Sequence, residues 1–333
     1  MRPADVVVRV VSADRPRFLV LVLALTFAVF ALSTRDFATL YNTFNMTQYG
    51  VEIGLLALGE TLVIISGGGS IDLSVGSMLS LSGVVLGMLT MWARLDVWTA
   101  ALLGILSGGA LGALNALLIT RVGIPALIVT LGTLYAYGSA ALVLTDTVPI
   151  SGLPASFFVL GQGRVLGVPL QVLAVFLPVA LALHFLLRYT AFGRALYGVG
   201  TNEVAARFAA INVRGVRFWV FTLSGVLAGL AAAVMTSRVA SARPDAGMGF
   251  ELQAITIAVL GGTLITGGEG TILGTILGVL VITVLSNGLQ LAGVHPIWQL
   301  GAVGVVLVTT VLLNQWLLRH RVVSWSPGTM PPA

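Results

Sequence analysis

The sequence contains no cysteine and no lysine, and it carries few charges of either sign. The absence of cysteine excludes a disulfide framework, a thiol nucleophile and a cysteine-ligated metal. Only 9% of the 333 residues are charged, whereas a soluble domain usually has about 25%. All 17 basic residues are arginine, the net charge is +5, and the arginines form no single dense patch. These shortages exclude a soluble enzyme and a nucleic-acid-binding protein.

The sequence contains long apolar runs and few charged residues. Hydrophobic residues make up 57% of the chain, and the mean hydropathy is +1.03. A membrane-spanning helix needs about 20 mostly apolar residues, and ten stretches qualify. We predict spans near 18–32, 50–66, 73–92, 97–120, 124–144, 168–187, 218–236, 252–266, 272–291 and 298–318. The first run lacks a convincing small-residue cleavage site, so we interpret it as an uncleaved helix.

This pattern predicts an all-α integral membrane protein with about ten transmembrane helices. A single membrane domain would cover 18–318, between an N-terminal segment (1–17) and a C-terminal tail (319–333). With both termini cytoplasmic, twelve of the 17 arginines fall on the inner side, as the positive-inside rule requires. Only an outer connection (145–167) and an inner one (188–217) are long. Neither offers a soluble domain, so ATP hydrolysis or capture of a solute would have to come from partners.

Glycine is abundant, with 40 residues. Lipid supplies no hydrophobic force between helices, so small residues that permit close packing hold a membrane bundle together. The spacing predicts three glycine ridges on helices, at 104/108/112, 225/229 and 270/274/278.

Two glycine clusters predict breaks in helices instead. They read SGGGSIDLSVG (66–76) and GGTLITGGEGTILG (261–274). Irregular backbone at membrane depth is tolerated only inside protein or along a wet cavity, and transporters use such breaks to aim helix ends at solutes. Both would lie on the inner side and meet near the inner mouth of a path. We expect Ser70 to cap the third helix and Asp72 to lie in its first turn, where a carboxylate opposes the positive helix end; direct contact with a solute is the alternative for Asp72.

Glu60 is the acidic residue deepest in an apolar run, and buried ionisable groups usually face a cavity or a partner. Glu60 and Asp72 would make a proton-relay pair, but no His or Arg accompanies them, so we favour a hydrogen-bonded Glu60 that lines the path. Thr130, Thr133 and Asn287 complete the candidates for the path. The three histidines are too scattered for a metal site, and we expect no cofactor bound by this chain.

Four segments resemble a known family in order along the chain. They are ETLVIISGGGSIDLSVGSMLSLSG (60–83), NALLITRVGIPALIVTLGTLY (115–135), FGRALYGVGTNEVAARFAAINV (192–213) and the stretch from SRVASARPDAGMGFE to GGEGTILGT (237–275). Through these segments the chain resembles the membrane permeases of bacterial ABC importers for simple sugars. The last segment is most similar to the rhamnose-type and autoinducer-2-type members. Two departures are the extra residues in GGGSIDLS, where GGIDLSVG is usual, and Asn115-Ala116 in place of Asn-Gly.

The resemblance implies a type II importer-like permease in the bacterial inner membrane. Its partners would be a second permease subunit (identical or paralogous), a cytoplasmic ATP-binding cassette ATPase that binds the ATP, and a periplasmic sugar-binding protein. The transported solute would be a monosaccharide or sugar-like molecule of the ribose, rhamnose or autoinducer-2 class.

The inner connection carries the candidate for coupling to the ATPase. We predict a short helix over 203–210, capped by Thr201 or Asn202, with Glu203 in its first turn and Asn212 and Arg214 at its end. Phe208 would anchor it in a groove of another protein, with Arg207 at the rim. Composition alone equally permits a helix lying on the membrane surface, and the resemblance favours coupling.

On the outer side, Arg238 and Arg243 oppose the positive-inside trend. Docking of acidic residues on a binding protein is one explanation, and capping of a helix end by Arg238 is the other. Two other functions remain as alternatives. A secondary transporter driven by an ion gradient would need buried charge partners along its path, and a membrane-embedded enzyme would need a nucleophile, base or metal constellation that this sequence lacks.

Overall fold

The computed structural model describes residues 15–323, and it is mostly helical. Most of the predicted N-terminal segment 1–17 and of the tail 319–333 lies outside these residues. Ten helices match the ten predicted spans: α2 (Arg15–Ser33), α3 (Leu40–Ile65), α4 (Val75–Met91), α5 (Val97–Leu117), α6 (Ala126–Leu144), α8 (Leu177–Tyr189), α11 (Val213–Val239), α12 (Phe250–Leu260), α13 (Ile272–Leu291) and α14 (Pro296–Val323). Seven helical segments of the described part are long and apolar enough to cross a membrane; α4, α12 and the apolar part of α14 are shorter.

Helix α3 is the most enclosed span. Nearly every residue from Gly50 to Ile65 is buried, and α11, α12 and α13 pack around it. The helix begins at Leu40, ten residues before the predicted start. Its first turns are polar, which lowers their hydropathy, but these side chains have partners in the bundle. Asn42 exchanges hydrogen bonds with Asn287 of α13, and Gln48 donates to the carbonyl of Gly161.

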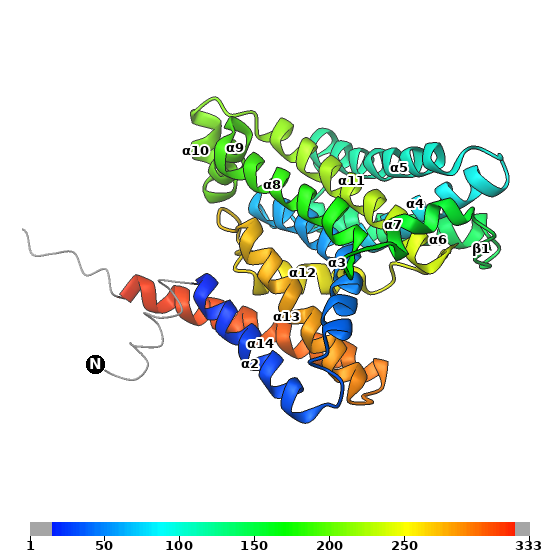
Figure 1. Ribbon diagram of the computed structural model, residues 1–333. Helices are drawn as coiled ribbons and strands as arrows, with labels where there is room; N and C mark the ends of the chain where they lie inside the picture. Colours follow the sequence, from blue (N-terminus) through cyan, green and yellow to red (C-terminus); the bar gives the residue numbers. More distant parts are fainter. Residues whose placement is uncertain (1–14, 324–333) are drawn as a thin grey trace, which may run out of the picture.

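Helices α5 and α11 run side by side along one face of the bundle (Figure 1). The predicted ridge of Gly104, Gly108 and Gly112 faces Gly225 and Gly229, so backbone meets backbone. A methyl group added at Gly108 would lie 2.4 Å from the carbonyl oxygen of Gly225, and one added at Gly112 would lie 3.0 Å from the Cα of Gly225. Two of the three predicted ridges are therefore one interface, which fits close packing without a hydrophobic driving force.

The connections contain small elements, and the short helix near 203–210 was predicted from the sequence, whereas the strands were not. Strands β1 (Ile150–Ser151) and β4 (Ser241–Ala242) pair antiparallel, and so do β2 (Arg164–Val165) and β3 (Val168–Pro169). Short helical pieces fill the rest: η1 (Leu118–Val122), η2 (Ala155–Phe157), α7 (Phe158–Gln162), η3 (Val172–Phe176), α9 (Ala191–Thr201) and α10 (Glu203–Phe208). Figure 1 shows α9 and α10 at one end of the bundle and β1 at the other.

Both predicted helix breaks are present. Helix α3 ends at Ile65 and α4 begins at Val75, while α12 ends at Leu260 and α13 begins at Ile272. Gly67, Gly68 and Gly69 have φ of 68°, 66° and 70°, a region that costs other residues energy. The expected ridge 270/274/278 is wrong at its first member, because Gly270 lies in the second break and not on α13.

The α5–α11 interface gives a prediction about folding. Gly108→Leu would drive a side chain into the backbone of α11, so we expect a loss of about 3 kcal/mol, the upper end for overpacking. Gly132→Leu is the matched control, since no atom lies within 4 Å of a methyl group added at Gly132 on α6. Thermal unfolding of the purified protein in detergent measures both. Equal stability of the two variants would contradict this packing.

Candidate transport core and coupling element

Glu60 and Asp72 lie together in the interior, and neither side chain is exposed. The Oε1 atom of Glu60 accepts a hydrogen bond from the backbone N–H of Asp72 at 3.1 Å. Asp72 accepts from the N–H and the hydroxyl of Ser74 at 3.0 and 2.6 Å, and from the hydroxyl of Ser224 on α11 at 3.1 Å. The carboxylates thus fix the first break to α3 and α11.

The expected capping of α4 is wrong in detail. Asp72 lies before the helix and not in its first turn, and the N-cap position is Ser74, not Ser70. The three glycines Gly67 to Gly69 and the residues that follow them turn before any helix starts, so α4 begins later than the apolar pattern suggests. Asp72 instead stabilises the turn that leads into α4, through the bonds of Ser74.

The polar network continues into two further helices. The hydroxyl of Ser74 accepts from the amide of Asn115 at 2.8 Å, and the Tyr137 hydroxyl donates to the Asn115 carbonyl oxygen at 3.0 Å. One chain of hydrogen bonds therefore connects α4, α5, α6 and α11. From the sequence, Asn115 stood out only as part of a departure from the family pattern, and its place in this network was not predicted. The signal that was available is that a buried polar side chain inside an apolar run needs a partner.

The other path candidates do not gather at one place. Thr130 is buried and donates to the carbonyl of Ile71 in the first break or to that of Ala126. Thr133 bonds to carbonyls of its own helix. Asn287 is occupied with Asn42. Thr130 thus contacts the core described above, and the role of all three along a path stays a prediction.

The two breaks touch each other, as predicted, and both touch α9. The N–H of Gly268 donates to the carbonyl of Ile65 at 3.0 Å. A methyl group added at Gly67 would lie 2.8 Å from the carbonyl oxygen of Gly200, and one added at Gly200 would lie 2.5 Å from the N atom of Gly268. We call Gly67, Gly200 and Gly268 the glycine junction. It joins the inner connection to both helix breaks through backbone atoms alone.

Helix α10 follows directly and ends in an exposed aromatic. Asn202 caps it by accepting from the N–H of Ala205 at 3.0 Å, which is one of the two predicted caps. Phe208, the last residue, is 90% exposed, and Val204 is 64% exposed. The helix stops at Phe208 and not at 210. Asn212 does not end α10, because its side chain caps α11 instead.

Glu203 anchors α10 to the bundle. Its carboxylate pairs with Arg207 at 2.6 Å and with Arg217 of α11 at 2.7 Å. The hydrogen bond from Arg207 lowers the pKa of Glu203, and the bond from Arg217 acts in the same direction. The contribution of these pairs is therefore complete above the ordinary glutamate pKa and is lost as the pH falls through the lowered one. The Arg217 guanidinium also lies against Gly68, where an added methyl group would meet its Nη2 at 2.4 Å.

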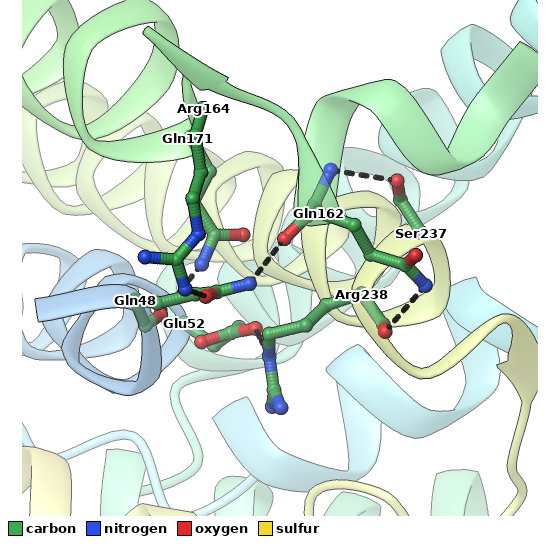
Figure 2. A network of polar contacts seen from close by, with 8 residues as sticks. Gln48, Glu52, Gln162, Arg164, Gln171, Ser237 and Arg238 are labelled. Atoms are coloured by element: carbon green, nitrogen blue, oxygen red, sulfur yellow. Dashed lines mark hydrogen bonds and ion pairs between the residues drawn. The ribbon is translucent and has the colours of Figure 1, made fainter. Parts of the chain in front are cut away.

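A second polar cluster lies near the end of the bundle that carries β1. Figure 2 shows Gln48 and Glu52 of α3 facing Gln162 and Arg164 of the outer connection and Arg238 of α11. Glu52 is 1% exposed and pairs with Arg238 at 2.6 Å. The Arg238 guanidinium also lies 4.8 Å from the centre of the Tyr49 ring.

This pair gives a third explanation for an arginine on the predicted outer side, beyond docking and capping: it compensates a buried carboxylate. Arg243 differs, because it forms an exposed two-bond pair with Asp245 at 3.0 and 3.1 Å. Docking of a binding protein by Arg238 and Arg243 stays a prediction. No local pattern identifies Glu52 as the partner of Arg238, since the two lie 186 positions apart in the sequence.

Comparison with family profiles matches residues 42–311 to the family described as "Branched-chain amino acid transport system / permease component". The chain is 41% identical over 277 residues to the ribose import permease protein RbsC of Bacillus subtilis, covering 82% of this chain and 84% of that one. It is 39% identical to the D-allose transport system permease protein AlsC of Escherichia coli, over 88% and 90% of the two chains.

The autoinducer 2 import system permease protein LsrD of Klebsiella pneumoniae is 41% identical, over 81% of both chains. No solved structure gives a significant match.

The Glu52–Arg238 pair yields a prediction for a double-mutant cycle. Glu52→Gln and Arg238→Gln should each cost about 3–5 kcal/mol, because each leaves a charge buried without its partner. The double variant should cost less than the two losses combined, since it leaves no buried charge. Arg243→Gln, which breaks an exposed pair, should cost at most about 1 kcal/mol. Thermal unfolding in detergent measures the set, and additive losses would exclude the coupling.

Proposed function

The chain belongs to this family of transport-system permeases, and on that premise we propose that it is the membrane-spanning subunit of an ATP-binding cassette importer for a monosaccharide or sugar-like solute. The relatives named above are permeases for ribose, D-allose and autoinducer 2, and each is similar over more than four fifths of this chain. The solute would belong to this class or to the rhamnose class. The chain would lie in the bacterial inner membrane with both termini in the cytoplasm.

Three kinds of partner complete the proposal for the assembly. A second permease, identical or paralogous, would form the pathway together with this chain. A periplasmic binding protein would deliver the sugar, and a pair of cytoplasmic ATPases would bind and hydrolyse the ATP. The chain itself would catalyse no reaction and carry no cofactor.

The exposed end of α10 is the observation that carries the proposal. An aromatic that is 90% exposed is costly in water and is typical of a binding anchor. A helix lying on the membrane is the alternative, but Glu203 and Arg217 tie α10 to the bundle and leave Phe208 projecting.

The same region supports a route for coupling. A shift of α10 would act on Arg217 and α9, and α9 contacts both helix breaks at the glycine junction. The first break leads to Glu60 and Asp72. Closure of the ATPases would thus reach the interior of the bundle through packed backbone. Energetic coupling of this kind requires two discrete arrangements of the breaks.

The ion-coupled alternative rests on the same buried carboxylates, Glu60 and Asp72. It predicts sugar uptake that survives without ATP and stops when an ionophore collapses the ion gradient. The importer proposed here predicts the opposite in both respects.

Phe208→Asp tests the coupling. A carboxylate in an apolar groove should weaken ATPase binding by about 2 kcal/mol or more, while the bundle stays folded because Phe208 is exposed. Phe208→Leu, which keeps an apolar anchor, should retain most activity. Sugar uptake and sugar-stimulated ATP hydrolysis in proteoliposomes are the readouts. Normal uptake and hydrolysis in the Asp variant would refute the coupling role.

The orientation has a separate test, which the absence of native cysteine makes clean. Thr201→Cys should react with a membrane-impermeant thiol reagent from the cytoplasmic side only, and Ser156→Cys from the periplasmic side only. Both residues are exposed; Thr201 ends α9, which lies at the end of the bundle away from β1 (Figure 1), and Ser156 lies in η2 of the outer connection. Reversed labelling would overturn the topology, and labelling of both from one side would show an error in the number of spans between them.

A further inference from the structure

Two interrupted segments meet near the middle of the bundle. Helix α11 has 27 residues and so a length of about 40 Å, and Ser224 lies near its midpoint. Because Ser224 bonds to Asp72, the start of α4 lies level with the middle of α11. The connection between α11 and α12 returns to the same level. A methyl group added at Gly76 would lie 2.2 Å from the carbonyl oxygen of Gly247, and the N–H of Gly247 donates to the Ser80 hydroxyl at 2.9 Å.

This connection therefore folds back into the bundle before the short α12 begins at Phe250. Figure 1 shows α12 in the middle of the structure. Backbone without regular structure at this depth is stable only where it is enclosed by protein or lines a cavity. The segment from Pro244 to Gly249 does line a cavity.

The cavity has a volume of about 220 Å³, and α4, α6 and this connection form its walls. Its polar groups are the hydroxyls of Ser77, Ser80, Tyr135 and Ser139 and the carboxylate of Glu251. The remaining wall is apolar or glycine, including Leu134, Leu142 and Met248. A single water needs about 10–15 Å³ of this kind of space, so the cavity has room for a small solute.

Among the described residues, Glu251 is the only charged one that lines this cavity. It stands in the first turn of α12, and the residue is half-buried. Its Oε2 lies beside Gly76, 2.7 Å from the position of an added methyl group, so the carboxylate reaches across to α4. A carboxylate at membrane depth is costly and usually faces a solute or ion path. Tyr135 and Ser139 are exposed on the side of α6 that faces the same space.

We propose that this cavity is a binding site for the hydroxyl groups of the transported solute, with Glu251 as the charged hydrogen-bond acceptor and Tyr135 and Ser139 as neutral partners. The inference rests on the proposed function, to which it adds a location and a mode of recognition. Hydroxyl donors suit a carboxylate, while the leucine and methionine wall faces the C–H surface of a sugar. Uncharged polyols satisfy both requirements, whereas anionic solutes would be repelled by Glu251.

Thiol protection tests occupancy directly. The Ser139→Cys variant is reconstituted in nanodiscs as the permease–ATPase complex, together with the sugar-loaded binding protein. The complex is then treated with a charged methanethiosulfonate, and the rate of cysteine modification is measured. D-ribose and D-allose are the probes, and sucrose is the osmotic control. We expect one of the two monosaccharides to slow modification of the cysteine, and sucrose to leave it unchanged. Ser156→Cys, on the exposed outer connection, should react at one rate in all conditions.

Uptake kinetics test the role of the carboxylate. Glu251→Gln should raise the apparent KM about ten- to hundredfold, the range for losing a hydrogen bond to a charged group. Glu251→Asp, which keeps the carboxylate, should recover part of the uptake. Ser139→Ala should raise the KM less, and Ser107→Ala on α5, whose hydroxyl bonds only to its own helix, should have no effect.

The outcomes separate this inference from the proposed function. If the native complex imports sugar with ATP but Glu251→Gln has a normal KM, or Ser139→Cys reacts at the same rate with and without sugar, the site is refuted and the importer stands. A cysteine at 139 that never reacts would mean that the second permease covers the cavity, which also refutes the site. Absence of ATP-dependent uptake of ribose, allose, rhamnose and autoinducer 2 alike by the native complex would overturn both.

Discussion

Backbone amides and carbonyls cannot remain unpaired in hydrocarbon, and the architecture follows from that constraint. Two interrupted helices can exist in this bundle only because other parts of the chain enclose the interruptions. The first break is held by Glu60, Ser74 and Ser224, and the second is held by contacts with Ile65 and α9. Glycine permits the contacts between the two breaks and α9, because Gly67, Gly200 and Gly268 bring their backbones within van der Waals distance.

Buried polarity is used in two distinct ways. Around Asp72, the N–H and hydroxyl of Ser74 and the hydroxyl of Ser224 satisfy the carboxylate without any positive charge, and the Asn115 amide in turn donates to the Ser74 hydroxyl. Near Arg238, a full ion pair does the same for Glu52. The hydrogen bonds of Asp72 tie the first break to α11. The Glu52–Arg238 pair ties the middle of α3 to the end of α11, and hydrogen bonds of Gln48 and Gln162 attach the outer connection to these two helices (Figure 2).

Much of this structure was predictable from the sequence, and the errors have physical causes. Hydropathy located ten spans because lipid demands apolar length, and glycine spacing located the α5–α11 interface. The start of α3 was missed because Asn42 and Gln48 look unsuitable for a membrane until their partners are known. Asp72 was placed in a helix that begins later, since the glycines before it leave the start of α4 undefined. The pairing of Glu52 with Arg238, and the return of Gly247 to Gly76, are tertiary contacts that no local pattern encodes.

The glycine junction has a mechanical consequence. When two elements touch through side chains, a displacement of one changes side-chain rotamers, and only part of the movement reaches the other. Gly67, Gly200 and Gly268 have no side chains, so at this point backbone presses on backbone. The glycine junction therefore deforms little, and a displacement of α9 would pass to both breaks almost undiminished. The junction also tolerates substitution poorly, because even one added methyl group would push the backbones apart. Motion between α9 and the two breaks would thus be transmitted stiffly at positions where only glycine fits.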